Sequence, residues 1–265
     1  MFLRHFESRG QSMYGASIRA WFLACWAVFV ILSKNTELEE YQNHKLNTRA
    51  VLPVRGSRVN SLRDKYPNYA ALSTHEIKWT PKHPVGDYRI LVDDMPESKC
   101  LVMAIHGGGI EPYTSNLAGA YVGTCKVYRF EGMKRRGNKD LHITSNHFDE
   151  PTALDMVQTA TTCVSLHGMS GPDKNVICLG GRNQHLKERF MDAAREYPLL
   201  PFEVHQCDYP MCASFCGSSK RNIVNKCSSE GGLQLEISRR LRDEMKASPG
   251  QTLAEKAIMH LIKVV

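Results

Sequence analysis

A histidine and a glutamate flank three consecutive glycines at residues 106–111, and together they could bind a metal ion. The segment follows the apolar run 101–105, which predicts a buried strand that ends at His106. Glycine has no Cβ, so the turn can fold tightly enough to bring Glu111 beside the imidazole. A catalytic zinc ion commonly takes two histidines and one glutamate and leaves its fourth position to water. This turn therefore offers two of the three ligands.

The third ligand has a candidate in His167. It follows a second short apolar run, residues 163–166, and it is again followed by glycine. In open α/β sheets, ligands gather beyond the carboxyl ends of the strands. His106 and His167 both occupy such predicted ends, so we expect their side chains to meet.

The segment 233–237 is a candidate for the catalytic carboxylate. Leu233, Leu235 and Ile237 alternate with Gln234 and Glu236, which is typical of a half-buried strand. Glu236 then points away from the apolar side, where it could reach a metal-bound water. A carboxylate there can take a proton from the water and later pass it to a leaving amine.

These residues belong to a series of short blocks: DKY at 64–66, DYR at 87–89, HGGGIEP at 106–112, DLHITS at 140–145, HFDEP at 147–151, VSLHG at 164–168, LGG at 179–181 and GLQLEIS at 232–238. Together the blocks resemble the poly-γ-glutamate hydrolase family, which is similar in fold to the zinc carboxypeptidases. The likeness runs from about Leu62 to the C-terminus. It implies a three-layer α/β/α fold with a mixed sheet, and one zinc ion on His106, Glu111 and His167. It also implies that Glu236 is catalytic and that the substrate is a polyanionic polymer of γ-linked glutamate.

Five other residues are candidates for substrate contacts. His142 and His147 lie in a polar segment that we expect to line the cleft. Arg182, Arg221 and Arg239 could bind substrate carboxylates, because a guanidinium fork binds a carboxylate bidentately. A solvated surface position is the alternative for each arginine. Arg182 and Arg221 also lie where the sequence departs from the family's pattern, so the departures affect substrate binding more than metal binding.

The N-terminal part has the pattern of a targeting segment. Arg4, Arg9 and Arg19 precede or flank the uncharged apolar stretch 20–32, and acidic residues follow it. Residues 1–33 therefore predict a signal peptide or an uncleaved signal anchor, with a buried core helix as the remaining alternative. We expect the protein to be secreted, or anchored in a membrane through residues 20–32 with its catalytic part facing outside.

We expect the remaining chain to divide into a polar linker at 34–61 and a zinc-dependent hydrolase domain at 62–265. In the second part, short apolar runs alternate with helical patterns, which is typical of an α/β fold. The predicted strands are 87–92, 101–105, 126–130, 142–145, 162–166, 176–179, 202–204 and 233–237. The predicted helices are 115–122, 151–161, 183–197 and 251–264.

Apart from Cys25, the chain has eight cysteines, and an even number in an exported chain indicates disulfides. Their spacing does not reveal the pairing. Four of them lie between residues 207 and 227 and could close a long loop near Glu236. The alternative is a structural zinc cluster on these four residues, Cys207, Cys212, Cys216 and Cys227, although the close pairs typical of such clusters are absent.

The formal net charge of +7 favours a polyanionic partner but does not by itself choose among nucleic acid, anionic lipid and polycarboxylate. The chain has no aromatic-basic RNA motif, and its best basic cluster, residues 133–137, is typical of a solvated loop. The family resemblance implies a γ-linked glutamate polymer as the partner. We also expect no nucleic acid as a partner and a protein that acts as a monomer.

The same residues are also compatible with other functions. An HGGG segment supplies oxyanion-hole amides in some serine hydrolases, but that chemistry needs a G-x-S-x-G motif, which the sequence lacks. A zinc peptidase or amidase acting on another γ-linked or cell-wall peptide is the nearest alternative. A non-catalytic module that binds polyanions is the third.

Overall fold

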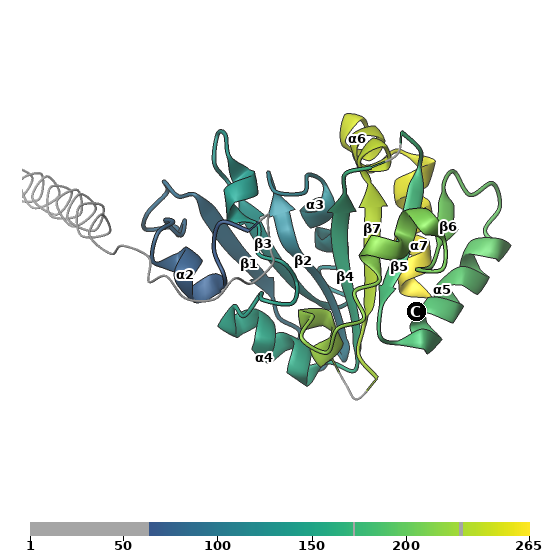
Figure 1. Ribbon diagram of the computed structural model, residues 1–265, viewed down its shortest axis with the longest axis horizontal. Coiled ribbons are helices and arrows are strands. Elements are labelled where there is room, and N and C mark those ends of the chain that lie inside the picture. Colours follow the sequence, from purple (N-terminus) through teal and green to yellow (C-terminus); the bar gives the residue numbers. More distant parts are fainter. Residues whose placement is uncertain (1–63, 172, 228–229) are drawn as a thin grey trace, which may run out of the picture. The chain divides into compact units, whose positions relative to one another are not determined.

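The computed structural model of the protein describes residues 64–265 except residues 172, 228 and 229. The described residues form a seven-stranded mixed sheet in the order β1-β3-β2-β4-β7-β5-β6, which runs from left to right in Figure 1. The expected targeting segment 1–33 and linker 34–61 lie outside the described residues. The expected domain boundaries therefore remain predictions.

The centre of the sheet is parallel. It consists of β3 (Lys126–Gly132), β2 (Cys100–Gly108), β4 (Thr162–Met169) and β7 (Leu233–Ser238). At one edge β1 (Tyr88–Asp93) runs antiparallel to β3. On the other side β5 (Val176–Gly181) runs antiparallel to β7 and parallel to β6 (Glu203–His205). The carboxyl ends of β2, β4 and β7 therefore meet at the same edge of the sheet.

Helices cover both faces of the sheet, which confirms the expected three-layer α/β/α fold with a mixed sheet. One face packs against α3 (Thr114–Gly119), α5 (Gln184–Glu196), α6 (Arg239–Ala247) and α7 (Leu253–Lys263). The other packs against α2 (Tyr69–Ser73), α4 (Pro151–Thr159) and the 3-10 helix η4 (Ile223–Lys226). Short 3-10 helices also occur at η2 (Asn138–Leu141) and η3 (Pro210–Phe215).

Strand alternation decides which side chains reach the site. On β4, Val164 and Leu166 pack in the core on the α5 and α7 side, whereas Cys163 packs on the α4 side. His167 follows the alternation of Cys163, and its register partner on β7 is Glu236. Both polar side chains therefore leave the sheet on the α4 side, as the period-two pattern of β7 predicts.

One expected strand is wrong. Residues 142–145 follow η2 and pair with no strand among the described residues. The backbone amide of Thr144 instead donates to a carboxylate oxygen of Asp64 at 2.7 Å, and the carbonyl of Ile143 accepts from His106 at 2.8 Å. Side chains thus satisfy the backbone groups that a neighbouring strand would otherwise pair, so the segment stays extended without joining the sheet.

Among the described residues, six cysteines form three disulfides: Cys100–Cys125, Cys163–Cys227 and Cys178–Cys212. The alternative of a zinc cluster on four cysteines is therefore wrong, because Cys212 and Cys227 are both disulfide-bonded. Disulfides persist in oxidising compartments, which indicates an extracellular protein. Within the described part of the chain, no helix is long and apolar enough to cross a membrane, and residues 20–32 lie outside that part.

Candidate metal centre and active site

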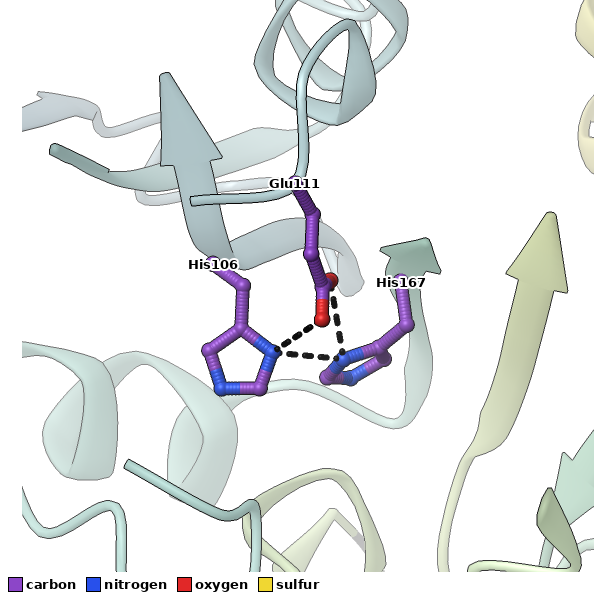
Figure 2. A group of neighbouring side chains, drawn as sticks. All are labelled: His106, Glu111 and His167. Carbon is purple, nitrogen blue, oxygen red and sulfur yellow. Dashed lines mark hydrogen bonds and ion pairs between the residues drawn. The ribbon is translucent and has the colours of Figure 1, made fainter. Parts of the chain in front are cut away.

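His106, Glu111 and His167 come together at the carboxyl ends of β2 and β4, where their side chains point toward one another (Figure 2). The three residues are buried, with exposed fractions of 2%, 7% and 2%. Nδ1 of His106 lies 3.1 Å from Oε1 of Glu111 and 3.1 Å from Nδ1 of His167. The other carboxylate oxygen of Glu111 lies 3.7 Å from Nδ1 of His167. One donor atom from each side chain therefore faces a common point.

A bulge in β2 makes this convergence possible. Between Ala104 and Gly107, β2 advances by three residues while its neighbour β3 advances by two, from Arg129 to Glu131. By strict alternation His106 would lie on the face opposite to His167. The extra residue turns the His106 side chain, as bulges commonly do beside functional sites.

The glycine turn brings Glu111 back to His106. The amide of Glu111 donates to the carbonyl of His106 at 2.8 Å, which closes the turn. Gly108 has a φ of 62°, in the left-handed region that favours glycine. A Cβ on Gly107 would lie 1.9 Å from Oγ of Ser115, so no larger residue fits there. The glycines are thus required by a positive φ at one position and a close approach at another.

The outer hydrogen bonds of the two imidazoles direct Nδ1 toward the common point. Nε2 of His106 donates to the carbonyl of Ile143 at 2.8 Å, so Nδ1 of the neutral ring carries a lone pair. Nε2 of His167 is hydrogen-bonded to Oγ of Ser165 at 2.8 Å. Metal-binding histidines are typically oriented by such a bond at the second nitrogen. Two nitrogens and a carboxylate in this arrangement fit a zinc ion with an open fourth position.

Glu236 lies next to His167 on β7 and is 8% exposed. Nε2 of Gln234 donates to Oε1 of Glu236 at 2.9 Å, and Nδ2 of Asn222 donates to Oε1 of Gln234 at 2.7 Å. Burial and the negative charge of Glu111 raise the pKa of Glu236 well above its ordinary value, against weaker opposing effects of Arg242 and Gln234. A carboxylate with a raised pKa is a stronger base. A cation bound to Glu111 would offset the second of these causes.

The metal candidates and Glu236 line one cleft of about 540 Å³. His142 also lines it: Nδ1 is hydrogen-bonded to Oδ1 of Asp64 at 2.6 Å, and Nε2 lies 3.9 Å from Oε1 of Glu111. Burial and the neighbouring His106 lower the pKa of His142, against the opposing effect of Asp64. The arrangement suits a neutral imidazole that borders the candidate metal site and can contact a substrate.

The remaining sequence candidates lie elsewhere. His147 is half-buried and does not border this cleft. Arg182, Arg221 and Arg239 are exposed and also lie outside its lining, and Nε of Arg239 forms an ion pair with Asp243 at 3.0 Å. Their role in binding substrate stays a prediction.

Sequence reasoning missed four residues that the structure brings to the site. Lys139 lines the cleft, and Asn222 and Gln234 form the hydrogen-bond chain to Glu236. Arg242 is buried on α6 and donates to backbone carbonyls close to the site residues without lining the cleft. Of these, only Arg242 had a usable signal: it occupies a position in line with Leu241 and Met245 on one helical face, where a charged residue is unusual.

Comparisons with known proteins identify relatives of this chain. Among curated relatives, the SPbeta prophage-derived UPF0714 protein YoqZ of Bacillus subtilis (strain 168) is 34% identical over 69% of this chain, and the match spans 61% of that relative's length. The UPF0714 protein YndL of the same strain is 35% identical over 69% of this chain and 67% of its own length.

Two solved structures share the fold with a TM-score of 0.64 and cover 76% of this chain. One is a bacteriophage poly-gamma-glutamate hydrolase, 31% identical, of which 95% is covered. The other is the zinc-free apo form of YndL, 30% identical, of which 96% is covered. The family described as poly-gamma-glutamate hydrolase matches residues 66–257, and this chain belongs to that family.

Proposed function

We propose that the protein hydrolyses γ-glutamyl amide bonds of poly-γ-glutamate, with one zinc ion at His106, Glu111 and His167 and with Glu236 as the general base. The observation that carries the proposal is the convergence of these four buried side chains on one cleft. Membership of the family supports the choice of substrate. The three disulfides support an extracellular site of action.

A zinc ion in this site would supply Lewis acidity, which polarises an amide carbonyl and acidifies water. Glu236 supplies the proton transfer. Gln234 holds Oε1 of Glu236, so Oε2 is the oxygen that accepts the proton from the attacking water. The same oxygen then returns the proton to the departing amine. Glu236 thus acts first as a base and then as an acid.

Positive charge and amides in the cleft fit a polymer that carries one free carboxylate on each unit. Lys139 is exposed at the cleft and can pair with such a carboxylate, while Asn146 offers an amide donor. The net charge of +7 attracts a polyanion at long range. We therefore expect binding to weaken as ionic strength rises.

The variant Glu236→Gln tests the assignment because it removes the base and keeps the shape. We expect it to retain stoichiometric zinc and to lose about 10²- to 10⁴-fold in hydrolysis of poly-γ-glutamate. Glu244→Gln, at an exposed carboxylate, is the matched control and should keep wild-type activity. Near-normal turnover by Glu236→Gln would show that the base is wrongly assigned.

A substrate panel tests the specificity of the wild-type protein. Poly-γ-glutamate should be cleaved, whereas poly-α-glutamate of the same charge should only bind. If the protein cleaves γ-linked cell-wall peptides in preference to poly-γ-glutamate, it belongs to another functional class of amidase. Binding of polymer without turnover in zinc-replete buffer would identify a non-catalytic module.

A further inference from the structure

Arg242 is a buried arginine that binds backbone instead of a carboxylate. It lies on α6 and is 3% exposed. Within residues 64–265, apart from the three that are not described, it forms no ion pair. Its guanidinium donates to three backbone carbonyls. The distances are 2.8 Å from Nη1 to Pro112, 3.1 Å from Nε to Ile237 and 3.4 Å from Nη2 to Met169.

Each of these carbonyls belongs to the segment that follows one residue of the site. Pro112 comes directly after Glu111, and Ile237 comes directly after Glu236. Met169 lies two residues after His167. Segments that are far apart in the sequence thus share one rigid, planar group with five N–H donors. The segments after two metal ligands and the base are therefore hydrogen-bonded to the same side chain.

Gly168 provides the space that the guanidinium occupies. A Cβ on Gly168 would lie 2.4 Å from Cζ of Arg242 and 2.6 Å from its Nε. The amide of the same glycine donates to Oε2 of Glu111 at 2.8 Å. Gly168 therefore contacts a metal ligand on one side and the arginine on the other, and its lack of a side chain allows both contacts.

The positive charge of Arg242 is favourable near the carboxylates of Glu111 and Glu236. Burying a guanidinium without an ion pair is costly, so its retention in this position needs compensation. Burial holds the pKa of Arg242 below its ordinary value, and the charges of Glu111, Asp243 and Glu236 offset part of this effect through space. A lysine would preserve the charge but could not donate to three separate carbonyls from one plane.

We propose that Arg242 is the positioning residue of this active site, holding the segments after Glu111, His167 and Glu236 at the spacing that the reaction needs. The inference rests on the proposed function. A structural role alone would lower stability and leave the geometry of the metal site unchanged. A positioning role would change the metal site in a protein that remains folded.

Arg242→Lys is the central variant, with Arg240→Lys on the exposed side of the same helix as its matched control. We expect Arg242→Lys to raise the zinc dissociation constant about 10- to 100-fold, as loss of outer contacts does at metal sites. We expect kcat to fall about 100-fold, because small misplacements of reacting groups cost that much. The visible absorption spectrum of the cobalt-substituted protein should change in Arg242→Lys and not in Arg240→Lys.

Gly168→Ala tests the same contact without altering any hydrogen-bonding group. The added methyl must displace the guanidinium, so its effects on zinc affinity and on the cobalt spectrum should resemble those of Arg242→Lys. In the double variant the two effects should be less than additive, because both disrupt one contact.

The proposal is overturned if Arg242→Lys keeps zinc affinity and kcat within about threefold of wild type, which is about 0.65 kcal/mol in free energy, and leaves the cobalt spectrum unchanged. A lower melting temperature alone would not rescue it. Wild-type protein that binds zinc but cleaves no poly-γ-glutamate would overturn the proposed function, and the metal measurements would still decide the role of Arg242. Wild-type protein that binds no divalent metal would overturn both.

Discussion

Two buried glutamates in this protein have opposite kinds of partner. Glu76 and Glu111 are each 7% exposed. Glu76 accepts from Nζ of Lys134 at 2.6 Å, from Nζ of Lys65 at 3.2 Å and from the hydroxyl of Tyr66. Its negative charge is therefore balanced by two ammonium groups, and the cluster is complete without any ligand.

Glu111 has no ammonium or guanidinium group within ion-pairing distance in the described part of the chain. Its close partners are the imidazoles of His106 and His167 and the amide of Gly168. An imidazole that binds a metal is neutral, so these partners orient the carboxylate without balancing its charge. A buried carboxylate arranged in this way is suited to a cation. The contrast separates a structural glutamate from a metal-binding one.

The largest expected difference between the two glutamates is in metal binding. Glu111→Gln removes a ligand, so we expect zinc affinity to fall by at least about 100-fold, since even outer contacts contribute 10- to 100-fold. Hydrolysis of poly-γ-glutamate should fall with it. Glu76→Gln should keep stoichiometric zinc and activity. Metal analysis after dialysis and the rate of polymer cleavage measure both variants, and equal zinc loss in both would end the distinction.

Removing the metal should separate the two variants by stability as well. A ligand at 100 times its dissociation constant stabilises the folded state by about 2.7 kcal/mol. We expect zinc to raise the unfolding free energy of wild type and of Glu76→Gln by about this amount, and that of Glu111→Gln by far less. Urea titrations with zinc and with a chelator measure the increment. A zinc-dependent increment retained by Glu111→Gln would place the ion elsewhere.

The same contrast explains how much of the site could be predicted from sequence. His106 and His167 were accessible because each directly follows a short apolar run that predicts a strand, and Glu111 was accessible because a glycine turn can bring it beside His106. Glu236 was accessible because the alternation along β7 shows which face it occupies. In these cases a local pattern fixes both the element and the direction of the side chain.

Glu76 and Arg242 depend on long-range contacts that no local pattern encodes, although the apolar neighbours Leu241 and Met245 indicate that Arg242 is buried. The partners of Glu76 are Lys65 and Lys134, and three strands, β1, β2 and β3, lie between these two lysines in the sequence. Arg242 depends on where α6 begins, and that helix follows β7 without a loop and was not predicted. Sequence predicts the strands and helices where the hydrophobic periodicity is strong. It wrongly predicts a strand at 142–145, where side chains satisfy the backbone groups that a neighbouring strand would pair.

A smaller effect is expected from the structural glutamate itself. Glu76→Gln leaves two ammonium groups without their counter-charge, which destabilises a folded protein. Because Lys65 is half exposed and Lys134 is 15% exposed, we expect a loss of about 2 kcal/mol, less than for a fully buried pair. Chemical unfolding at pH 7 measures the loss. Glu97→Gln, at an exposed carboxylate, is the control and should change the unfolding free energy by less than about 0.5 kcal/mol.

The smallest effect is the pH dependence of that loss. Burial raises the pKa of Glu76, but the hydrogen bonds from Lys134, Tyr66 and Lys65 outweigh it and hold the pKa below its ordinary value. A glutamate in the unfolded chain has a pKa of about 4.3. The stabilisation by ionised Glu76 is therefore fully present above that pH and is lost as the pH falls through the lower pKa of the folded protein. The gap in unfolding free energy between wild type and Glu76→Gln should therefore stay constant from pH 7 to about 5 and shrink below about 4. Measuring both proteins with chelator present removes the contribution of the metal site, and a gap that widens in acid would show that Glu76 is not held ionised by its lysines.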